Sequence, residues 1–234
     1  MPRFAHALTL ALTVLSASAA AGQTYDPAAD FSTAANPNGV WQYAWSNSLG
    51  GPLTLYPNHV NMQGIDFWQN AAAGDNPPYV SHNGTSSTVN YAGSVPYPPG
   101  QLGLHPGPNG EYSVIRWTAP SAGSVKVSGS FYRLDQFATT DVHLLKNGTS
   151  IFDGTVNSPG PTPFSLGQDV LLGDTIDFFV GYGNGSYFND STGLSATIVV
   201  QPVPEPTGLV ALAAGLLAGG AAVRRWRASR KAAR

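Results

Sequence analysis

The sequence predicts an all-β protein, a jelly-roll-like antiparallel β-sandwich, and three observations support this prediction. Short runs rich in β-branched and aromatic residues recur through the middle of the chain. The 27 glycines and 19 prolines among 234 residues supply frequent turns between these runs. Between the two ends of the chain, no segment shows a convincing helical period of apolar residues. Many short strands at this spacing are typical of sandwiches and jelly rolls.

The strand signals are clearest in the second half of the chain. Val125 and Val127 alternate with polar residues, as expected of a strand with one buried face. Asn147-Gly148 lies between two β-type runs and favours a tight hairpin, because both residues tolerate positive φ. We expect strands, in chain order, at 112–118, 124–131, 141–146, 149–152, 169–172, 175–180 and 194–200.

The first half, 36–110, is less regular but contains an aromatic face. Trp41, Tyr43 and Trp45 alternate along the chain, so in a strand their side chains share one side. We expect this face to belong to the core, because aromatic side chains contribute heavily to cores. A platform that stacks on sugar rings is the alternative. We interpret residues 24–202 as one sandwich with long loops, and two small β-domains are the alternative.

The composition excludes several classes of function. The chain contains no cysteine, which excludes a disulfide scaffold, a thiolate zinc site and a cysteine nucleophile. The whole chain has a formal charge of −2, but residues 24–202 carry four basic and twelve acidic residues, a formal charge of −8. Nucleic-acid binding is therefore disfavoured, because phosphate recognition needs a basic surface.

The amino end has the features of a secretory signal peptide. A short basic start is followed by the apolar run 7–17, which is too short to span a bilayer. Small residues come next, and Ala19-x-Ala21 fits a cleavage site. We therefore expect a signal peptide at 1–21 and an exported domain at 24–202.

The carboxyl end has the features of a membrane anchor. The segment 207–223 holds 17 residues without a charge, which as a helix would be about 26 Å long. Arg224, Arg225 and Arg227 follow at once and form a basic stop-transfer signal. By the positive-inside rule, the tail 224–234 stays cytoplasmic and everything before the span is exported.

Pro204, Glu205 and Pro206 stand directly before this span, and the region 203–234 resembles the PEP-CTERM sorting signal. The two prolines hold the motif extended, because each disfavours helical geometry in the preceding residue. The resemblance implies recognition by an exosortase-type transpeptidase, which cuts near the motif, after transport by the secretion machinery. It also implies an inner-membrane intermediate and then a cell-surface or extracellular-matrix location in a bacterium that makes exopolysaccharide.

Residues 31–198 resemble an uncharacterised extracellular β-module that recurs ahead of such tails. The resemblance is based on the order of four segments, FSTAANPNGVWQYAW, LHPGPNGEYSVIRWTAP, TTDVHLLKNGTSIF and GDTIDFFVGYGNGSYFNDSTGLSATI. No activity is attached to that module, so the resemblance implies no catalytic residues. It supports the sandwich fold and the exterior location.

The sequence offers no catalytic constellation, and we assign no catalytic residue. It has no Gly-x-Ser-x-Gly elbow, no phosphate-binding glycine loop and no closely spaced histidine pair. We therefore expect a non-catalytic surface or exopolysaccharide-associated matrix protein that binds carbohydrate weakly. A secreted polysaccharide hydrolase is the alternative. Tyr182, Tyr187 and Phe188, in a loop rich in glycine and asparagine, form the candidate ligand platform and are expected to be exposed.

Calcium is the one candidate cofactor, because secreted modules often hold it through loop carboxylates and carbonyls. Asp135, Asp141 and Asp190 are the candidate ligands. Aspartate beside glycine and threonine is also common in ordinary turns, which is the alternative for all three residues.

Overall fold

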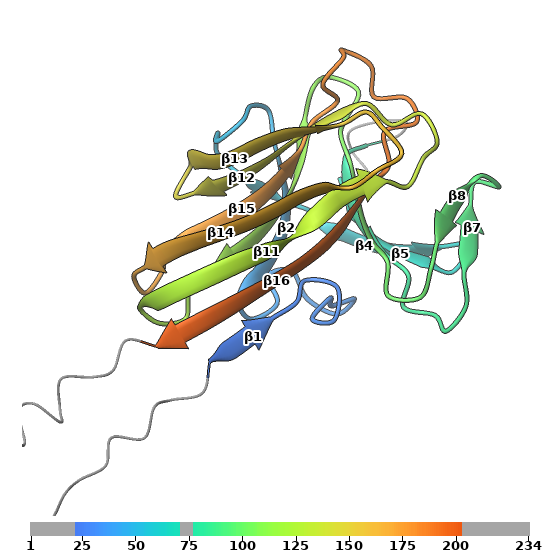
Figure 1. Cartoon of the computed structure of the whole chain (residues 1–234). Helices are drawn as coiled ribbons and strands as arrows, with labels where there is room; N and C mark the ends of the chain where they lie inside the picture. The colour runs from blue at the N-terminus through green and yellow to red at the C-terminus, as the bar shows by residue number, and fades with distance from the viewer. Residues whose placement is uncertain (1–21, 71–76, 203–234) are drawn as a thin grey trace, which may run out of the picture. The chain divides into compact units, whose positions relative to one another are not determined.

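Antiparallel β-sheets form nearly all the regular structure in the computed structural model, which describes residues 22–70 and 77–202 (Figure 1). These ranges contain no α-helix, so no helix in them is long and apolar enough to cross a membrane. The predicted all-β, antiparallel class is confirmed, while the jelly-roll subtype stays a prediction. The predicted signal peptide and the sorting tail lie outside the described residues.

Two sheets pack face to face, and a small two-stranded ribbon accompanies them. Within the described ranges, the larger sheet has the order β14 (Thr162–Val170), β11 (Gly123–Arg133), β16 (Thr192–Pro202), β9 (Leu102–His105), β6 (Tyr79–His82), β5 (Ile65–Gln69), β4 (Asn58–Met62), with β1 (Gln23–Tyr25) paired to β16. The smaller sheet has the order β13 (Thr149–Val156), β12 (Thr140–Lys146), β15 (Thr175–Val180), β10 (Tyr112–Thr118), β2 (Trp41–Ser46), β3 (Thr54–Leu55). The ribbon pairs β7 (Val89–Tyr91) with β8 (Val95–Tyr97).

The main core lies between the two sheets and is rich in aromatic side chains. Val125 and Val127 of β11 point into it, while Lys126 between them is exposed, as the alternating pattern predicts. Trp41 and Tyr43 of β2 are buried, so the expectation that they belong to the core is confirmed. The third member of the predicted aromatic face, Trp45, is half-buried and packs against the edge of this core.

Local turn chemistry explains one prediction that is confirmed and one that is wrong. Asn147 and Gly148 have φ of 49° and 79° and join β12 to β13 in a tight hairpin, as predicted. The predicted strand 169–172 is wrong at both ends, because β14 begins at Thr162 and ends at Val170. Leu171 and Leu172 lie instead in the turn that leads into β15.

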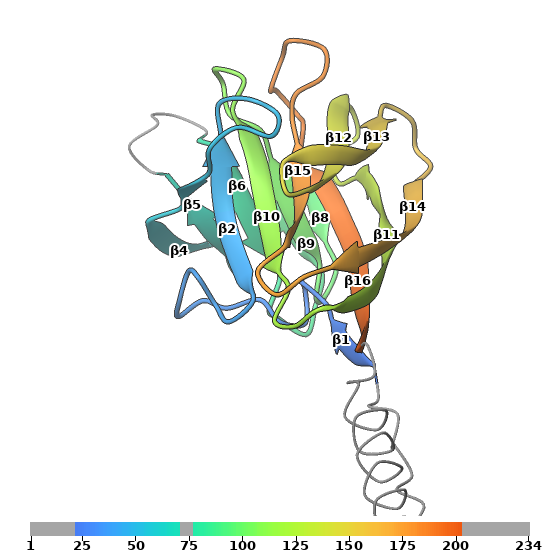
Figure 2. The ribbon, with the colours of Figure 1, turned by 90° about the vertical axis from the view of Figure 1, so that its left-hand side faces the viewer.

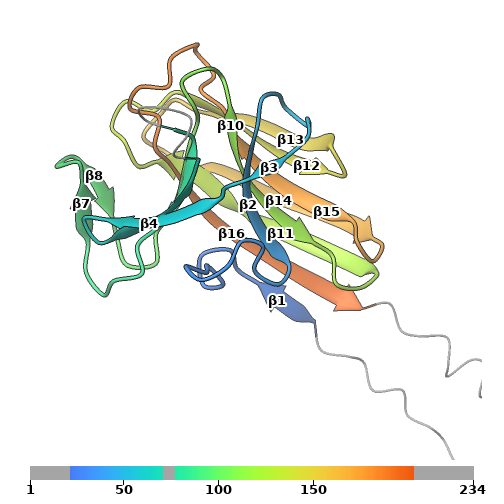
Figure 3. The ribbon, with the colours of Figure 1, turned by 180° about the vertical axis from the view of Figure 1, so that it is seen from behind.

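The first half of the chain contributes to both sheets rather than forming loops alone. β2 lies between β10 and β3 in the smaller sheet. β4, β5, β6 and β9 extend the larger sheet (Figure 2). The view from behind shows β3 and β4 following β2 along the chain and β4 reaching toward the ribbon (Figure 3). Residues Gly22–Pro202 form one compact unit.

Candidate functional site

A hollow of about 260 Å³ lies at one end of the smaller sheet, and we name it the Asp141 pocket. Its lining residues are Gly110, Tyr112, Asp141, Tyr182 and Gly183. They come from the start of β10 and the turn before it, from the start of β12 and from the loop that follows β15. Three neighbouring strands of the sheet therefore supply the pocket.

Strand register brings these residues together. Val180, the last residue of β15, pairs with the second residue of β10 and with the third residue of β12. One position further toward this end of the sheet lie Tyr112 on β10, Asp141 on β12 and Gly181 directly after β15. Gly181 therefore lies between the tyrosine and the aspartate, and its backbone N–H donates to the carbonyl oxygen of Asp141 at 2.9 Å.

Two glycines allow this close approach. A Cβ at Gly181 would collide with the carboxylate of Asp141 and with the ring of Tyr112. Gly183 has φ of 53°, and a Cβ there would lie 2.6 Å from the carbonyl oxygen of Thr139. The Gly-Tyr-Gly segment 181–183 is thus shaped to let the loop pack against β12 while it carries Tyr182.

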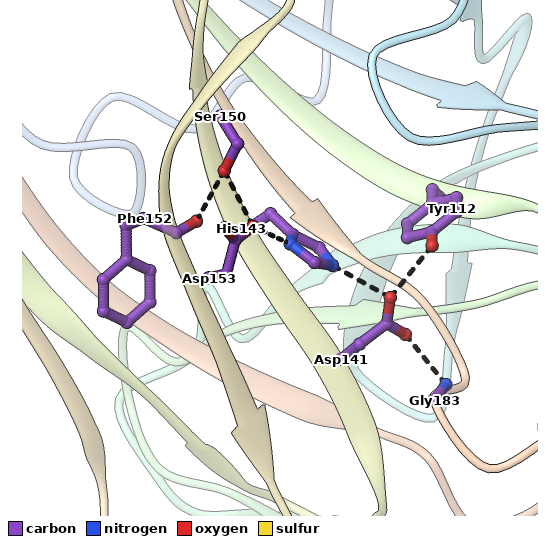
Figure 4. Close-up of polar contacts among 7 residues, drawn as sticks. All are labelled: Tyr112, Asp141, His143, Ser150, Phe152, Asp153 and Gly183. Carbon is purple, nitrogen blue, oxygen red and sulfur yellow. Dashed lines mark hydrogen bonds and ion pairs between the residues drawn. The ribbon is translucent and has the colours of Figure 1, made fainter.

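The carboxylate of Asp141 is held by three hydrogen bonds (Figure 4). Its Oδ2 accepts from the hydroxyl of Tyr112 at 2.9 Å and pairs with Nε2 of His143 at 2.9 Å. Its Oδ1 accepts from the backbone N–H of Gly183 at 2.8 Å. Burial alone would raise the pKa of Asp141, but these hydrogen bonds outweigh it and hold the pKa below its ordinary value. The group is therefore a carboxylate at neutral pH.

His143 links the pocket to a second carboxylate on the outer face of the smaller sheet. Its Nδ1 pairs with Oδ1 of Asp153, which also accepts from the hydroxyl of Ser150 at 2.7 Å (Figure 4). Burial would lower the pKa of His143, but its hydrogen bonds to Asp141 and Asp153 raise it above the ordinary value. The imidazole therefore favours the form in which both ring nitrogens donate.

This arrangement suits a neutral ligand with several hydroxyl groups. An ionised carboxylate accepts about four hydrogen bonds, and three protein donors already occupy Asp141, so Oδ1 keeps capacity for a ligand hydroxyl. The oxygen of Tyr112, which donates to Asp141, keeps its acceptor sites. The ring of Tyr182 supplies an apolar face in the same hollow.

The predicted ligand platform is divided between two places. Tyr182 lines the Asp141 pocket and is half-buried rather than exposed as predicted. Tyr187 and Phe188 stack on each other with ring centroids 4.4 Å apart, outside the residues that line the pocket. Phe188 is exposed as predicted, whereas Tyr187 is half-buried with its ring edge-on to His105.

The three candidate calcium ligands do not gather into a cluster. In the described residues, no group of three or more histidine, cysteine, aspartate or glutamate side chains is placed to hold a metal ion. Asp141 belongs to the pocket network. Asp190 is buried; its Oδ1 accepts from the N–H of Thr139 at 2.8 Å, and its Oδ2 has no partner among the described residues. Calcium at Asp190 stays a prediction.

Asp190 also has a strongly shifted pKa. Its pKa is raised to about 6, mainly by burial; hydrogen bonds from Thr139 oppose the shift, and the negative charges of Asp135 and Asp141 add to it. A cation near Oδ2 would reverse this effect, because it would stabilise the ionised form.

A second hollow of about 410 Å³ is less suited to a ligand. Its polar side chains include Asp26, His82 and Asn83. The amide of Asn83 already donates to two backbone carbonyl oxygens, and Oδ1 of Asp26 already accepts from the N–H groups of Ala28 and Ala29. These groups hold the protein's own loops in place.

Sequence reasoning missed Tyr112, His143 and the glycines of the pocket. One signal was present: Asp141 and His143 are two residues apart in a strand, so they share a face opposite the apolar residues between and beyond them. The role of Tyr112 depends on strand register, which the sequence does not reveal.

No family model and no curated protein matches the chain. The CBM51 from Clostridium perfringens GH95, solved with methyl-galactose, is 13% identical with a TM-score of 0.33, and the match covers 63% of this chain and 95% of that chain. The CBM51-2 and INT domains of Clostridium perfringens ZmpB are 11% identical with a TM-score of 0.33, over 43% of this chain and 22% of that chain. Rabbit GITRL is 20% identical with a TM-score of 0.29, and the match covers 40% of this chain and 75% of that chain. Likenesses this weak carry no argument about function.

Proposed function

We propose that the protein is an exported, non-catalytic surface protein whose sandwich binds neutral carbohydrate weakly at the Asp141 pocket. The observation that carries the proposal is the carboxylate of Asp141, which is fixed in a hollow also lined by Tyr112 and Tyr182. A fixed carboxylate accepts sugar hydroxyls, and tyrosine rings stack on the apolar faces of pyranose rings. The small, open hollow supports weak rather than tight binding.

The charge of the exported part favours a neutral ligand. Residues 24–202 carry four basic and twelve acidic residues, so an anionic polysaccharide would be repelled. A neutral exopolysaccharide or its fragments is the ligand class that we propose.

The pocket supports binding better than hydrolysis. Glycoside hydrolysis commonly uses two carboxyl groups that flank the scissile bond. Among the residues that line the Asp141 pocket, Asp141 supplies the single carboxyl group.

A glycan array tests this proposal directly. Residues 22–202, which contain both sheets, should bind neutral oligosaccharides without releasing reducing sugar. Asp141→Asn should lose this binding, whereas the matched variant Asp169→Asn, at an exposed aspartate outside the pocket lining, should retain it. Absence of binding to every neutral glycan, or release of reducing sugar that depends on Asp141, would contradict the proposal.

We also propose that the tail sorts the protein. The resemblance of Pro204-Glu205-Pro206, the uncharged segment 207–223 and the following arginines to a PEP-CTERM signal supports processing by an exosortase-type transpeptidase. Before processing, the span would hold the protein in the inner membrane with a cytoplasmic carboxyl end. Replacing Arg224, Arg225 and Arg227 by serine should weaken membrane retention and maturation. A variant that localises and matures like the parent would contradict this proposal.

A further inference from the structure

Two adjacent leucines protrude at one end of the sandwich. Leu171 and Leu172 are 70% and 74% exposed, and they lie between β14 and β15. Single exposed apolar residues are common on protein surfaces, but two neighbouring leucines at the tip of a turn form a small apolar knob. We call the segment 171–174 the leucine turn.

Hydrogen bonds hold the leucine turn in place. The N–H of Asp174 donates to the carbonyl oxygen of Leu171 at 3.0 Å, and Oδ2 of Asp174 accepts from the N–H of Leu171 at 2.9 Å. Gly173, with φ of 88°, occupies the third position, as in a type II turn. The N–H of Gly173 donates to the carbonyl oxygen of Ala119 at 2.9 Å, which links the turn to its neighbour. The leucines are thus presented by a fixed frame.

The leucine turn lies at the end of the sheet where the described chain stops. Gly123 of β11 pairs with Val170 on one side and with Pro202 on the other. Since neighbouring strands lie about 4.8 Å apart, Val170 and Pro202 are separated by about 10 Å. Figures 1 and 3 agree that β16 ends beside the connection from β14 to β15.

A short connection follows Pro202. Four residues, 203–206, precede the uncharged segment 207–223 in the sequence. An extended chain spans at most about 3.6 Å per residue, so this connection reaches at most about 14 Å. A bilayer that held 207–223 would therefore keep this end of the sandwich near its surface.

We infer that the leucine turn contacts the surface of the lipid bilayer and orients the sandwich upon it. This inference rests on the membrane anchoring in the proposed function. β15 begins after the leucine turn and ends at the Asp141 pocket, so the six residues of the strand separate the two features. Docking through the leucines would therefore point the pocket away from the membrane, toward extracellular polymers.

The nearby charges indicate the kind of lipid. Asp169 is exposed beside the end of β14, and Asp174 belongs to the leucine turn itself. Nζ of Lys146 lies 3.4 Å from Oδ2 of Asp174 and offsets one of these two negative charges. A zwitterionic surface therefore suits this end better than an anionic one, which would repel the remaining aspartate.

Single-cysteine probes in the full chain test the contact, because the chain has no cysteine of its own. An environment-sensitive dye is attached to Ser121→Cys, in the turn beside the leucines, or to Gln136→Cys, at the opposite end; both positions are exposed. A third probe, Ala214→Cys, reports on the span. Each protein is reconstituted into phosphatidylcholine vesicles with and without nitroxide-labelled lipid.

We expect lipid nitroxides to reduce the fluorescence of the probes at 214 and 121, but not of the probe at 136. The Leu171→Ser/Leu172→Ser variant should lose the reduction at 121, whereas the matched Phe137→Ser variant at the opposite end should keep it. Phe137 is a suitable control because it is 64% exposed.

The outcomes separate this inference from the anchoring on which it rests. Three results would overturn the inference and leave the anchoring intact. They are quenching at 214 without quenching at 121, equal quenching at 121 and 136, and quenching at 121 that survives the loss of both leucines. Shielding of the probe at 121 in the absence of lipid would assign the leucines to a protein contact and also overturn it. No quenching at 214 would overturn the anchoring itself.

Discussion

Nε2 of His143 lies 2.9 Å from Oδ2 of Asp141, and this contact fixes the carboxylate at the rim of the pocket. The two residues are neighbours on one face of β12, and neither is fully exposed. The contact matters for function because it keeps Asp141 ionised and oriented. It uses Oδ2, so Oδ1 keeps its capacity for a ligand hydroxyl. It also makes stability depend on pH.

The contact between His143 and Asp141 predicts a window of pH in which it stabilises the fold most. The raised pKa of His143 contributes stability below pH 6.5, and this contribution is lost as pH rises through the folded-state pKa. The lowered pKa of Asp141 contributes stability above pH 3.8, and this contribution is lost as pH falls through its folded-state pKa. The contribution is therefore greatest between about pH 4 and pH 6.5.

His143→Gln tests this window. Urea denaturation from pH 5 to pH 9 should show the free energy of unfolding of the parent falling toward that of the variant as pH rises. A constant difference between the two proteins across this range would mean that the imidazole does not change its charge within the contact.

Asp190 predicts a second loss of stability with rising pH, opposite in sign to the dependence that Asp141 contributes. The pKa of Asp190 is raised to about 6, so the fold loses stability as pH rises from about 4 through about 6 and the buried carboxyl group ionises. In the presence of a chelator, the free energy of unfolding of the parent should fall by on the order of 2 kcal/mol relative to that of Asp190→Asn between pH 4 and pH 7. Parallel pH profiles of the two proteins would contradict the shifted pKa.

Calcium binding at Asp190 makes a separate prediction. If Oδ2 takes part in a calcium site, calcium at pH 7 should raise the thermal midpoint of the parent, and chelation should lower it again. Asp190→Asn should show neither change. If chelation does not lower the thermal midpoint of a parent protein saturated with calcium, Asp190 belongs to an ordinary turn.

Trp41 predicts a large loss of stability on truncation. Its ring is 1% exposed in the main core, and its Nε1 donates to Oδ2 of Asp30 at 3.0 Å. Trp41→Ala should lower the free energy of unfolding by about 3–5 kcal/mol. Phe188→Ala, at an exposed aromatic, should change it by less than about 0.5 kcal/mol. Chemical denaturation of both variants measures the contrast, and similar losses would contradict these assignments.

Local chemistry made part of this structure predictable. The hairpin at Asn147-Gly148 follows from two residues that tolerate positive φ, and the burial of Val125 and Val127 follows from alternation. The apolar run from Val170 to Leu172 predicts a strand that continues through both leucines. The turn formed by Gly173 and Asp174 overrides that preference through its own hydrogen bonds.

The pocket was less predictable, because long-range pairing assembles it. Tyr112 and Asp141 are far apart in sequence, and they meet because β15 pairs with the strands of both. Tyr182 was identified from its glycine-rich surroundings, a local signal. Its partners depend on strand order and register, which a single sequence does not specify.

Binding of neutral oligosaccharides, measured by titration calorimetry on residues 22–202, tests the central claim most directly. The ligand identified on the glycan array should bind the parent. Asp141→Asn and Tyr182→Ala should remain folded but give no measurable heat of binding. Phe137→Ala, at an exposed aromatic outside the pocket lining, should bind like the parent. Unchanged affinity in Asp141→Asn and Tyr182→Ala would contradict the assignment of this pocket as the carbohydrate site.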